Sequence, residues 1–437
     1  MNISNYIKYH YKDALHVARL AGANVYNNEF TKLVNLKYIR SLTSKHVRIQ
    51  DLFKEYWPSF KLKYGDKLRP SIIKNVEAMI GCRDLTKGYL FYECPNCDNF
   101  HLTGLSCNSR FCPSCGHRYR DERALAIKSK LLDVHHRHFV FSVPYDLRPF
   151  FWKCRKLFHV LFQSVNEALH LTITKSSLDK KLDRKLGFAA FLHTSGRSLN
   201  CHPHLHILIA EATVDKHGNM KRLFFFPFER LRKSFMYCFI NNMSKCLKDF
   251  GDKSLYNDFQ KLRNFISKKY EEGFYSYGPK IKEEEKFDST DETAKYLARY
   301  ASHPPIAESN LLSLDSETNE IIWKYTPHEG DGTPEIIKEH PHNLIKRLIR
   351  HILDESFHQI RYYGFYSNRT NRTKKLTKKI NYFQHNKLKS NLTWHKMIMR
   401  CFKYDPILCQ CGHKMILNLE YSYLPTYKNE KRNIDYG

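Results

Sequence analysis

The stretch SLNCHPHLHILIA, residues 198–210, places three histidines at alternate positions directly before an apolar run. Side chains alternate between the two faces of a strand, so His202, His204 and His206 are expected to share one face, with Leu205 facing the core. The alternative is a polar face exposed to water, but the ILIA run favours a buried central strand. Two imidazoles at i and i+2 on a strand can share one cation. We therefore expect His204 and His206 to bind a metal ion.

A third ligand must come from another segment. HRHFVFSVP (136–144) and GFAAFLHTSG (187–196) are rich in β-branched and aromatic residues and predict two further strands. A hairpin-like return would bring His193 of the second stretch next to His204, and His193 is our candidate for the third position. His202 and a residue of a downstream helix remain alternatives.

That helix is predicted by FDSTDETAKYLARYASHPP, which begins with a Ser-x-x-Glu capping box and ends at two prolines. Tyr296 and Tyr300 are four residues apart, so both hydroxyls lie on one helix face. Two tyrosines at this spacing are usually packing residues. Beside a histidine-rich strand, they are candidate nucleophiles.

Cysteines form a second pattern, in ECPNCDNFHLTGLSCNSRFCPSCGH. Two C-x-x-C turns close a tetrahedral zinc site, which predicts Zn²⁺ ligation by Cys94, Cys97, Cys112 and Cys115. Cys107 is a further candidate. His101 and His117 are also within reach, and a second metal is compatible with the pattern. Near the C-terminus, CFKYDPILCQCGHK offers Cys401, Cys409, Cys411 and His413 for a small knuckle, although C-x-C is not the usual turn.

Composition indicates a partner. The chain has 437 residues and a formal net charge of +28, which attracts a polyanion such as nucleic acid. The tract at 361–400 holds no acidic residue and many aromatic ones, which suits a single strand, although a solvated basic linker has the same composition. No segment predicts a membrane span or a signal peptide, so we expect a cytoplasmic protein.

The organisation we expect is α+β. It comprises a helical basic region at 1–90, a zinc-binding module at 91–120, a mixed domain at 121–310 with a central antiparallel sheet and helices, and a basic region at 311–437 with the candidate knuckle.

The order HPHLH, YLARY and an upstream SCNSRFCPSCG module resembles the two-tyrosine HUH rolling-circle transposases, in particular the IS-ninety-one-like insertion-sequence family. HUH denotes His-hydrophobic-His, which His204, Leu205 and His206 fill here. The resemblance spans roughly residues 90–310. DPILCQC also resembles a C-terminal element of that family, which normally carries C-x-x-C.

The resemblance implies an HUH endonuclease domain with Mg²⁺ or Mn²⁺ at the histidines and Zn²⁺ at the cysteines. It implies that Tyr296 and Tyr300 attack single-stranded DNA at element ends through 5′-phosphotyrosine intermediates. The sequence has no phosphate-binding loop of a helicase, so we expect host replication machinery to separate the strands of the nucleoid DNA. We expect further DNA contacts from basic side chains of the tyrosine helix and the basic tract: Lys295, Arg299, Lys374, Lys375, Lys378 and Lys379.

Two other functions are compatible with parts of the pattern. A plasmid-type replication initiator or relaxase uses the same chemistry, but the zinc module and the YLARY spacing argue against it. A non-catalytic zinc-dependent DNA-binding protein would leave His204, His206 and the tyrosine pair unexplained. We therefore expect a transposase.

Overall fold

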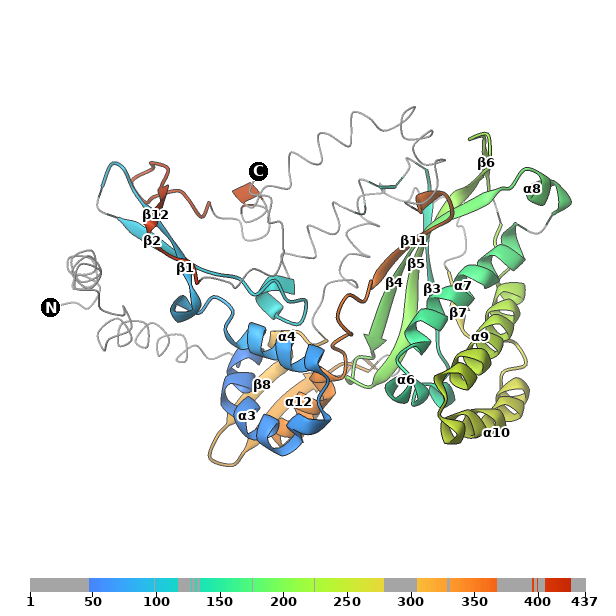
Figure 1. Cartoon of the computed structure of the whole chain (residues 1–437), viewed down its shortest axis with the longest axis horizontal. Helices are drawn as coiled ribbons and strands as arrows, with labels where there is room; N and C mark the ends of the chain where they lie inside the picture. The colour runs from blue at the N-terminus through green and yellow to red at the C-terminus, as the bar shows by residue number, and fades with distance from the viewer. Residues whose placement is uncertain are drawn as a thin grey trace.

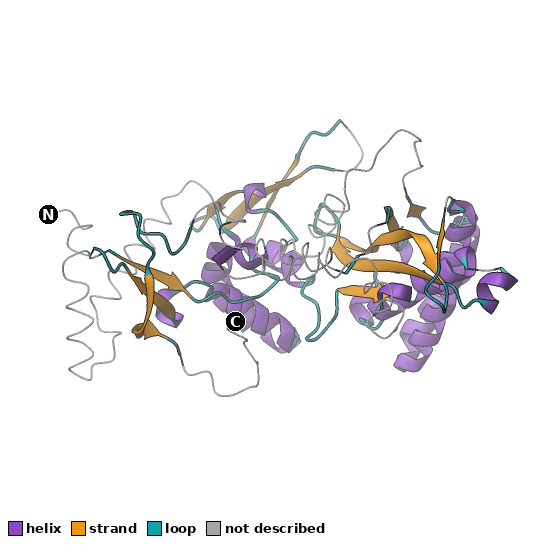
Figure 2. Cartoon of the chain, turned by 90° about the horizontal axis from the view of Figure 1, so that it is seen from above, coloured by secondary structure: helices purple, strands orange, loops and turns teal. Residues whose placement is uncertain are grey.

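The computed structural model describes residues 47–97, 99–116, 127, 130–131, 134–174, 176–223, 225–278, 305–327, 331–367, 395–396, 399 and 405–425. These residues form three bodies, each with its own antiparallel sheet (Figures 1 and 2). No helix among them is both long and apolar enough to cross a bilayer.

The largest body is built on a six-stranded sheet, which we call the main sheet. Its strand order is β11-β4-β5-β3-β7, and β6 pairs with β5 beyond that path. Helices α6, α7, α9 and α10 cover one face (Figure 1). The elements are β3 (His136–Ser142), η3 (Tyr145–Leu147), α6 (Phe150–Lys153), α7 (Leu157–Ile173), α8 (Ser177–Lys181), β4 (Lys185–Ser195), β5 (Cys201–Val214), β6 (Met220–Arg222), α9 (Phe228–Phe250), α10 (Lys253–Lys269), β7 (Ser276–Tyr277), β11 (Ile360–Tyr363) and η5 (Gly364–Tyr366).

Alternation along β5 decides what each face of the main sheet contacts. Leu205 and Ile207 are fully buried against the helical layer, as the sequence predicted. Leu208 and Ala210 are buried on the other face, against Phe365. A strand buried on both sides explains the nearly continuous apolar run.

The second body packs three helices against a three-stranded sheet of order β10-β9-β8. Proline at the first position fixes the backbone for two of these helices, α4 and α12. The elements are α3 (Ile49–Tyr64), η1 (Gly65–Lys67), α4 (Pro70–Ile80), η4 (Glu308–Asn310), β8 (Leu311–Asp315), β9 (Glu320–Tyr325), β10 (Glu335–Glu339) and α12 (Pro341–Ile349).

The third body is a three-stranded ribbon of order β12-β1-β2, preceded by η2 (Leu85–Lys87). It joins β1 (Tyr89–Glu93) and β2 (Phe100–Gly104) to β12 (Ile416–Tyr423) from the far end of the chain (Figure 1). Tyr89 and Phe91 form a small buried apolar cluster in it.

The expected domain boundaries need correction at both ends. The region assigned to 311–437 supplies elements to all three bodies. The elements from β8 through α12 belong to the second body, β11 belongs to the main sheet, and β12 belongs to the ribbon. The module assigned to 91–120 likewise begins earlier, because β1 starts at Tyr89. These pairings join residues more than 150 positions apart, so local pattern could not predict them.

Helix boundaries in the main-sheet body follow local signals. The helical stretch that begins at Phe150 is interrupted between α6 and α7. Gly251, in the left-handed region at φ 87°, ends α9, and the side chain of Asp252 accepts a hydrogen bond from the Leu255 N–H to begin α10.

Candidate functional site

Strands β4 and β5 bring the three predicted histidines together. His193 of β4 pairs directly with His204 of β5, and His206 follows two residues later on the same face. One nitrogen of each ring lies within 4.8 Å of the others. His206 is buried, while His193 and His204 are half-buried. The antiparallel return of β4 onto β5 thus assembles a triad that can reach one cation.

Hydrogen bonds orient the imidazoles of this histidine triad. His204 Nδ1 lies 2.7 Å from the His202 carbonyl, which can only accept, so His204 carries its proton on Nδ1. Its Nε2 lone pair then faces His206 Nε2 at 3.1 Å. Nitrogens bound cis to one divalent ion at about 2.1 Å are separated by about 3 Å, so this spacing fits a shared cation.

His138 of β3 completes the arrangement. Its Nε2 lies 2.8 Å from His206 Nδ1, and the two rings stack with centroids 5.0 Å apart. In the tautomer that metal binding requires, His206 donates its Nδ1–H to His138 and keeps Nε2 free. Residues 136–144 are predicted from the sequence only as a strand, and the His-x-His alternation within it is the pattern that points to His138.

Burial keeps the triad ready to bind a cation. Desolvation lowers the pKa of His204 to about 4 and holds the pKa of His206 well below its usual value. Both rings are therefore neutral at pH 7, which is the protonation state that ligates metals. His202, the alternative third ligand, lies outside the triad: its Nε2 is 2.7 Å from the Ser142 hydroxyl.

The cysteines separate into two tetrads, which corrects the expected single site. Cys112 and Cys115 lie with Cys82 and Cys107, whereas Cys94 and Cys97 lie with two C-terminal cysteines. The pairs were expected to converge because they are close in sequence. Instead, Cys94 and Cys97 lie at the turn between β1 and β2, whereas Cys112 and Cys115 follow β2. The length of the hairpin therefore separates the two pairs.

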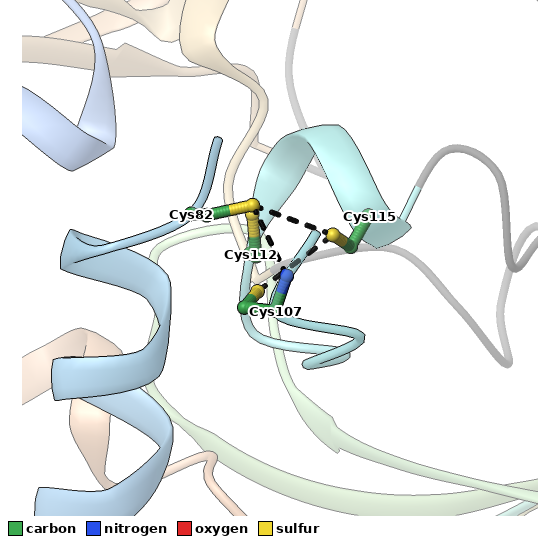
Figure 3. Close-up of side chains that lie close together, drawn as sticks. All are labelled: Cys82, Cys107, Cys112 and Cys115. Carbon is green, nitrogen blue, oxygen red and sulfur yellow. Dashed lines mark hydrogen bonds between the residues drawn. The ribbon is translucent and has the colours of Figure 1, made fainter. Parts of the chain in front are cut away.

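The first group, which we call the inner tetrad, comprises Cys82, Cys107, Cys112 and Cys115 (Figure 3). Cys115 Sγ lies 3.6 Å from Cys82 Sγ and 3.7 Å from Cys107 Sγ. Zinc–sulfur bonds of about 2.3 Å in a tetrahedron place the sulfurs about 3.8 Å apart. The tetrad therefore has the dimensions of a zinc site, and it is part of the core that α3, α4 and α12 share. Cys82, which follows α4, was not among our candidates.

The second group, which we call the outer tetrad, comprises Cys94, Cys97, Cys409 and Cys411. Cys94 Sγ is 3.4 Å from Cys411 Sγ, and Cys97 Sγ is 3.6 Å from Cys409 Sγ. Hydrogen bonding from the Cys411 backbone lowers the pKa of Cys409 to about 6. Cys409 therefore favours the thiolate, the form that binds zinc, whereas the pKa of Cys97 in the same tetrad is raised to about 12.

Several predicted residues lie outside the described part of the chain. They are the tyrosines Tyr296 and Tyr300, the basic residues Lys295, Arg299, Lys374, Lys375, Lys378 and Lys379, and the alternative metal ligands His117 and Cys401.

A groove of about 480 Å³ lies between the second body and the main-sheet body. Its polar lining is cationic, with no carboxylate among the lining side chains that the structure describes. Lys346 Nζ lies 4.3 Å from the centre of the Tyr64 ring, and the Arg350 guanidinium carbon lies 5.8 Å from that of Trp152. Proteins that bind single-stranded nucleic acid stack aromatic side chains on the bases and contact the phosphates with neighbouring cationic side chains.

Two segments of the chain match family models of known proteins. Residues 52–143 match the family model described as "Transposase zinc-binding domain", and residues 187–374 match the model described as "Putative transposase". The first segment contains the whole inner tetrad, and the second contains the histidine triad.

Two curated relatives cover most of the chain. The Sinorhizobium fredii protein named "Putative transposase y4qJ" is 26% identical over 333 residues, which is 74% of this chain and 80% of the relative. The transposase for insertion sequence element IS801 of Pseudomonas savastanoi pv. phaseolicola is 28% identical over 320 residues, 69% of this chain and 72% of the relative. No solved structure matches the chain.

Proposed function

The chain belongs to the IS-ninety-one-like transposases, and we propose that it nicks and rejoins single-stranded DNA at the ends of a mobile element by HUH chemistry. The observation that carries the proposal is the convergence of His193, His204 and His206 on one face of a central antiparallel strand. The antiparallel main sheet with helices on one face is compatible with an HUH endonuclease domain.

The triad is suited to a divalent cation. Three neutral imidazole nitrogens can bind Mn²⁺ and, with water and phosphate oxygens added, Mg²⁺. A cation held there would polarise the scissile phosphate and offset the charge that develops during attack. The protein itself orients the ligands. The His202 carbonyl fixes the imidazole of His204, and His138 fixes that of His206.

We assign the attack to Tyr296 and Tyr300. A tyrosine hydroxyl that displaces the 3′ oxygen at a phosphodiester leaves a 5′-phosphotyrosine and a free 3′-OH, and no nucleotide hydrolysis is needed because the bond energy is retained. Two tyrosines four residues apart allow one to hold a cleaved strand while the other attacks a second strand.

The DNA partner is supported by charge and by the groove. The net charge of +28 favours a polyanion, and the groove places Lys346 and Arg350 beside aromatic rings. We propose that the strand also contacts Lys295, Arg299 and the basic tract residues Lys374, Lys375, Lys378 and Lys379. The zinc-binding domain would recognise an element end or support the fold. Host replication would separate the DNA strands. The protein would act in the cytoplasm on nucleoid DNA.

Two rival functions are less well supported. The matches to transposases and to a transposase zinc-binding domain favour transposition over a replication initiator or relaxase. A non-catalytic DNA-binding protein would have no use for three histidines within 4.8 Å of one another.

Covalent trapping tests the proposal. Purified protein is incubated with labelled single-stranded oligonucleotides that carry the element's ends, with Mn²⁺ or Mg²⁺, and resolved on a denaturing gel. We expect a metal-dependent adduct that persists in at least one single variant (Tyr296→Phe or Tyr300→Phe) and disappears in the double variant and in His204→Ala. Wild-type protein that binds the strands without forming an adduct would support the non-catalytic alternative instead.

A further inference from the structure

The outer tetrad lies partly outside the segments that the family models match. Cys94 and Cys97 belong to the matched zinc-binding segment, which ends at residue 143. Cys409 and Cys411 follow the end of the second matched segment at residue 374. Neither family model therefore covers the C-terminal pair.

Geometry points to a metal at this position. The three short sulfur–sulfur separations of the outer tetrad are 3.4 Å (Cys94–Cys411), 3.5 Å (Cys97–Cys411) and 3.6 Å (Cys97–Cys409). These distances are too long for a disulfide and slightly shorter than the spacing of about 3.8 Å around a tetrahedral zinc ion. They match the separations in the inner tetrad, which lies within the zinc-binding segment.

The backbone supports the C-terminal pair as ligands. Gly412, at φ 85°, turns the chain directly after Cys411, and its N–H donates to the Cys409 carbonyl. The Cys409 N–H in turn donates to the His413 carbonyl, and the Asn99 side-chain amide lies 3.6 Å from Cys409 Sγ. A C-x-C pair in such a tight turn can aim two thiolates at one point, which compensates for the missing residue of a C-x-x-C motif.

The ribbon needs such a site. In the part of the ribbon that the structure describes, the apolar cluster contains two buried side chains, Tyr89 and Phe91, and β12 adds partly exposed packing such as Phe91 against Tyr421, with centroids 5.5 Å apart. A three-stranded sheet with so small a core is marginal without a metal or another support. The ribbon also joins cysteines 312 to 317 residues apart, a long loop whose closure a metal would secure.

We infer that Cys94, Cys97, Cys409 and Cys411 bind a structural Zn²⁺ ion, separate from that of the inner tetrad, that fastens the C-terminal strand β12 to the ribbon. This zinc clasp fixes the chain after the basic tract through Cys409 and Cys411, while η5 packs into the main-sheet body. Residues 368–394, between η5 and this cysteine pair in the sequence, contain no acidic side chain.

Zinc stoichiometry tests the clasp directly. Because the histidine triad could also take zinc, the measurement is made on full-length His204→Ala/His206→Ala protein, purified with zinc and desalted, by elemental analysis. We expect two zinc ions per chain in this background and one after Cys409→Ser/Cys411→Ser or Cys94→Ser/Cys97→Ser. The matched control is Cys201→Ser/Cys246→Ser, which removes two half-buried cysteines outside both tetrads and should retain two ions.

Two results would overturn the inference. One zinc per chain in the background protein, unchanged by Cys409→Ser/Cys411→Ser, would mean that the outer tetrad binds no metal. Two ions retained in that variant would mean that other ligands hold the second zinc. The stoichiometry of the background protein needs no cysteine variant to fold, so it remains informative if the serine variants aggregate.

A second measurement tests the fastening itself. A protease site is inserted between Ser367 and His395, the chain is cut, and the fragments are separated under native conditions with and without a zinc chelator. We expect the C-terminal fragment to remain bound in zinc and to be released by the chelator or by Cys409→Ser/Cys411→Ser. Release with zinc present, or retention in chelator, would show that zinc does not fasten β12.

Discussion

His138 Nε2 and His206 Nδ1 lie 2.8 Å apart, so a histidine of strand β3 orients a candidate metal ligand of strand β5. Outer hydrogen bonds of this kind fix the tautomer of a ligating imidazole, and their loss typically costs 10–100-fold in metal affinity or activity. We therefore expect His138→Ala to weaken Mn²⁺ binding by about that factor. Titration of DNA cleavage with Mn²⁺ should show a raised half-saturation concentration, with much of the maximal rate recovered at high Mn²⁺.

The controls for His138 separate orientation from bulk. His138→Gln keeps a side-chain oxygen that can accept from His206 Nδ1–H, so it should retain more Mn²⁺ affinity than the alanine variant. His217→Ala removes an exposed histidine from the turn after β5 and should leave the titration unchanged. Equal loss in the alanine and glutamine variants, at unchanged Mn²⁺ dependence, would assign His138 a packing role only.

Buried histidines away from the triad predict how stability depends on pH. Desolvation lowers the pKa of both His136 and His351 to about 4, below the value of about 6.5 in an unfolded chain. Between pH 6.5 and 4 the unfolded chain therefore binds protons that the native chain does not. The free energy of unfolding is therefore unaffected by the titration of these two histidines above pH 6.5. It falls by about 1.4 kcal/mol per pH unit for each of them as the pH drops towards 4.

Denaturant unfolding at pH 7.0 and pH 5.0 checks this pH dependence. The free energy of unfolding should be lower at pH 5.0, and His351→Gln, which keeps hydrogen-bonding capacity towards Thr194 and Leu199, should reduce the difference. Replacement of His358, an exposed histidine, is the control and should leave the difference unchanged. A difference unaffected by His351→Gln would contradict a neutral buried His351.

Local periodicity accounts for the part of the site that could be predicted. His204 and His206 share a face because strand side chains alternate, and His193 joins them because β4 and β5 are antiparallel neighbours joined by a short turn. Both relationships depend on residues close in sequence. The strand predicted at 136–144 corresponds to β3 (His136–Ser142) for the same reason.

The cysteine partition could not be predicted because it depends on distant pairing. Cys94 and Cys97 meet partners more than 310 residues away, and that encounter follows from β12 pairing with β1. The two C-x-x-C motifs look like one site when only their own spacing is considered. Likewise, β11 joins the main sheet as an edge strand whose short sequence, Ile360–Tyr363, lies at the start of the basic tract.

The groove predicts a specific loss of single-stranded DNA affinity. If Lys346 and Arg350 contact phosphates, replacing either with alanine should reduce the slope of log affinity against log salt by about 0.7, the value for one contact on a single strand. Fluorescence anisotropy with a labelled oligonucleotide over a range of salt concentrations measures this slope. Lys221→Ala, an exposed charge on β6, is the charge-matched control and should change the slope less. An equal effect of all three variants would indicate non-specific attraction.

Gly364 tests whether the region beyond residue 310 is part of the main-sheet body. Its φ is +60°, and a Cβ added there would lie only 1.5 Å from the Leu186 carbonyl oxygen of β4. Neither the backbone nor this close approach can accommodate a side chain, so Gly364→Ala must shift β11 and the Phe365 side chain that packs behind the sheet. We expect several kcal/mol of lost stability, beyond the cost of about 1 kcal/mol for a strained but open position.

Gly218→Ala supplies that open comparison. Gly218 also has a positive φ, of 91°, but a Cβ there meets nothing within 4 Å. Thermal unfolding of the two variants thus separates backbone strain from the clash with β4. If Gly364→Ala proved no more destabilising than Gly218→Ala, β11 would not pack on β4 as described, and a nuclease domain ending near residue 310 would again be tenable. A much larger loss at Gly364 would instead mean that the histidine triad depends on chain beyond residue 310, because β4 carries both Leu186 and His193.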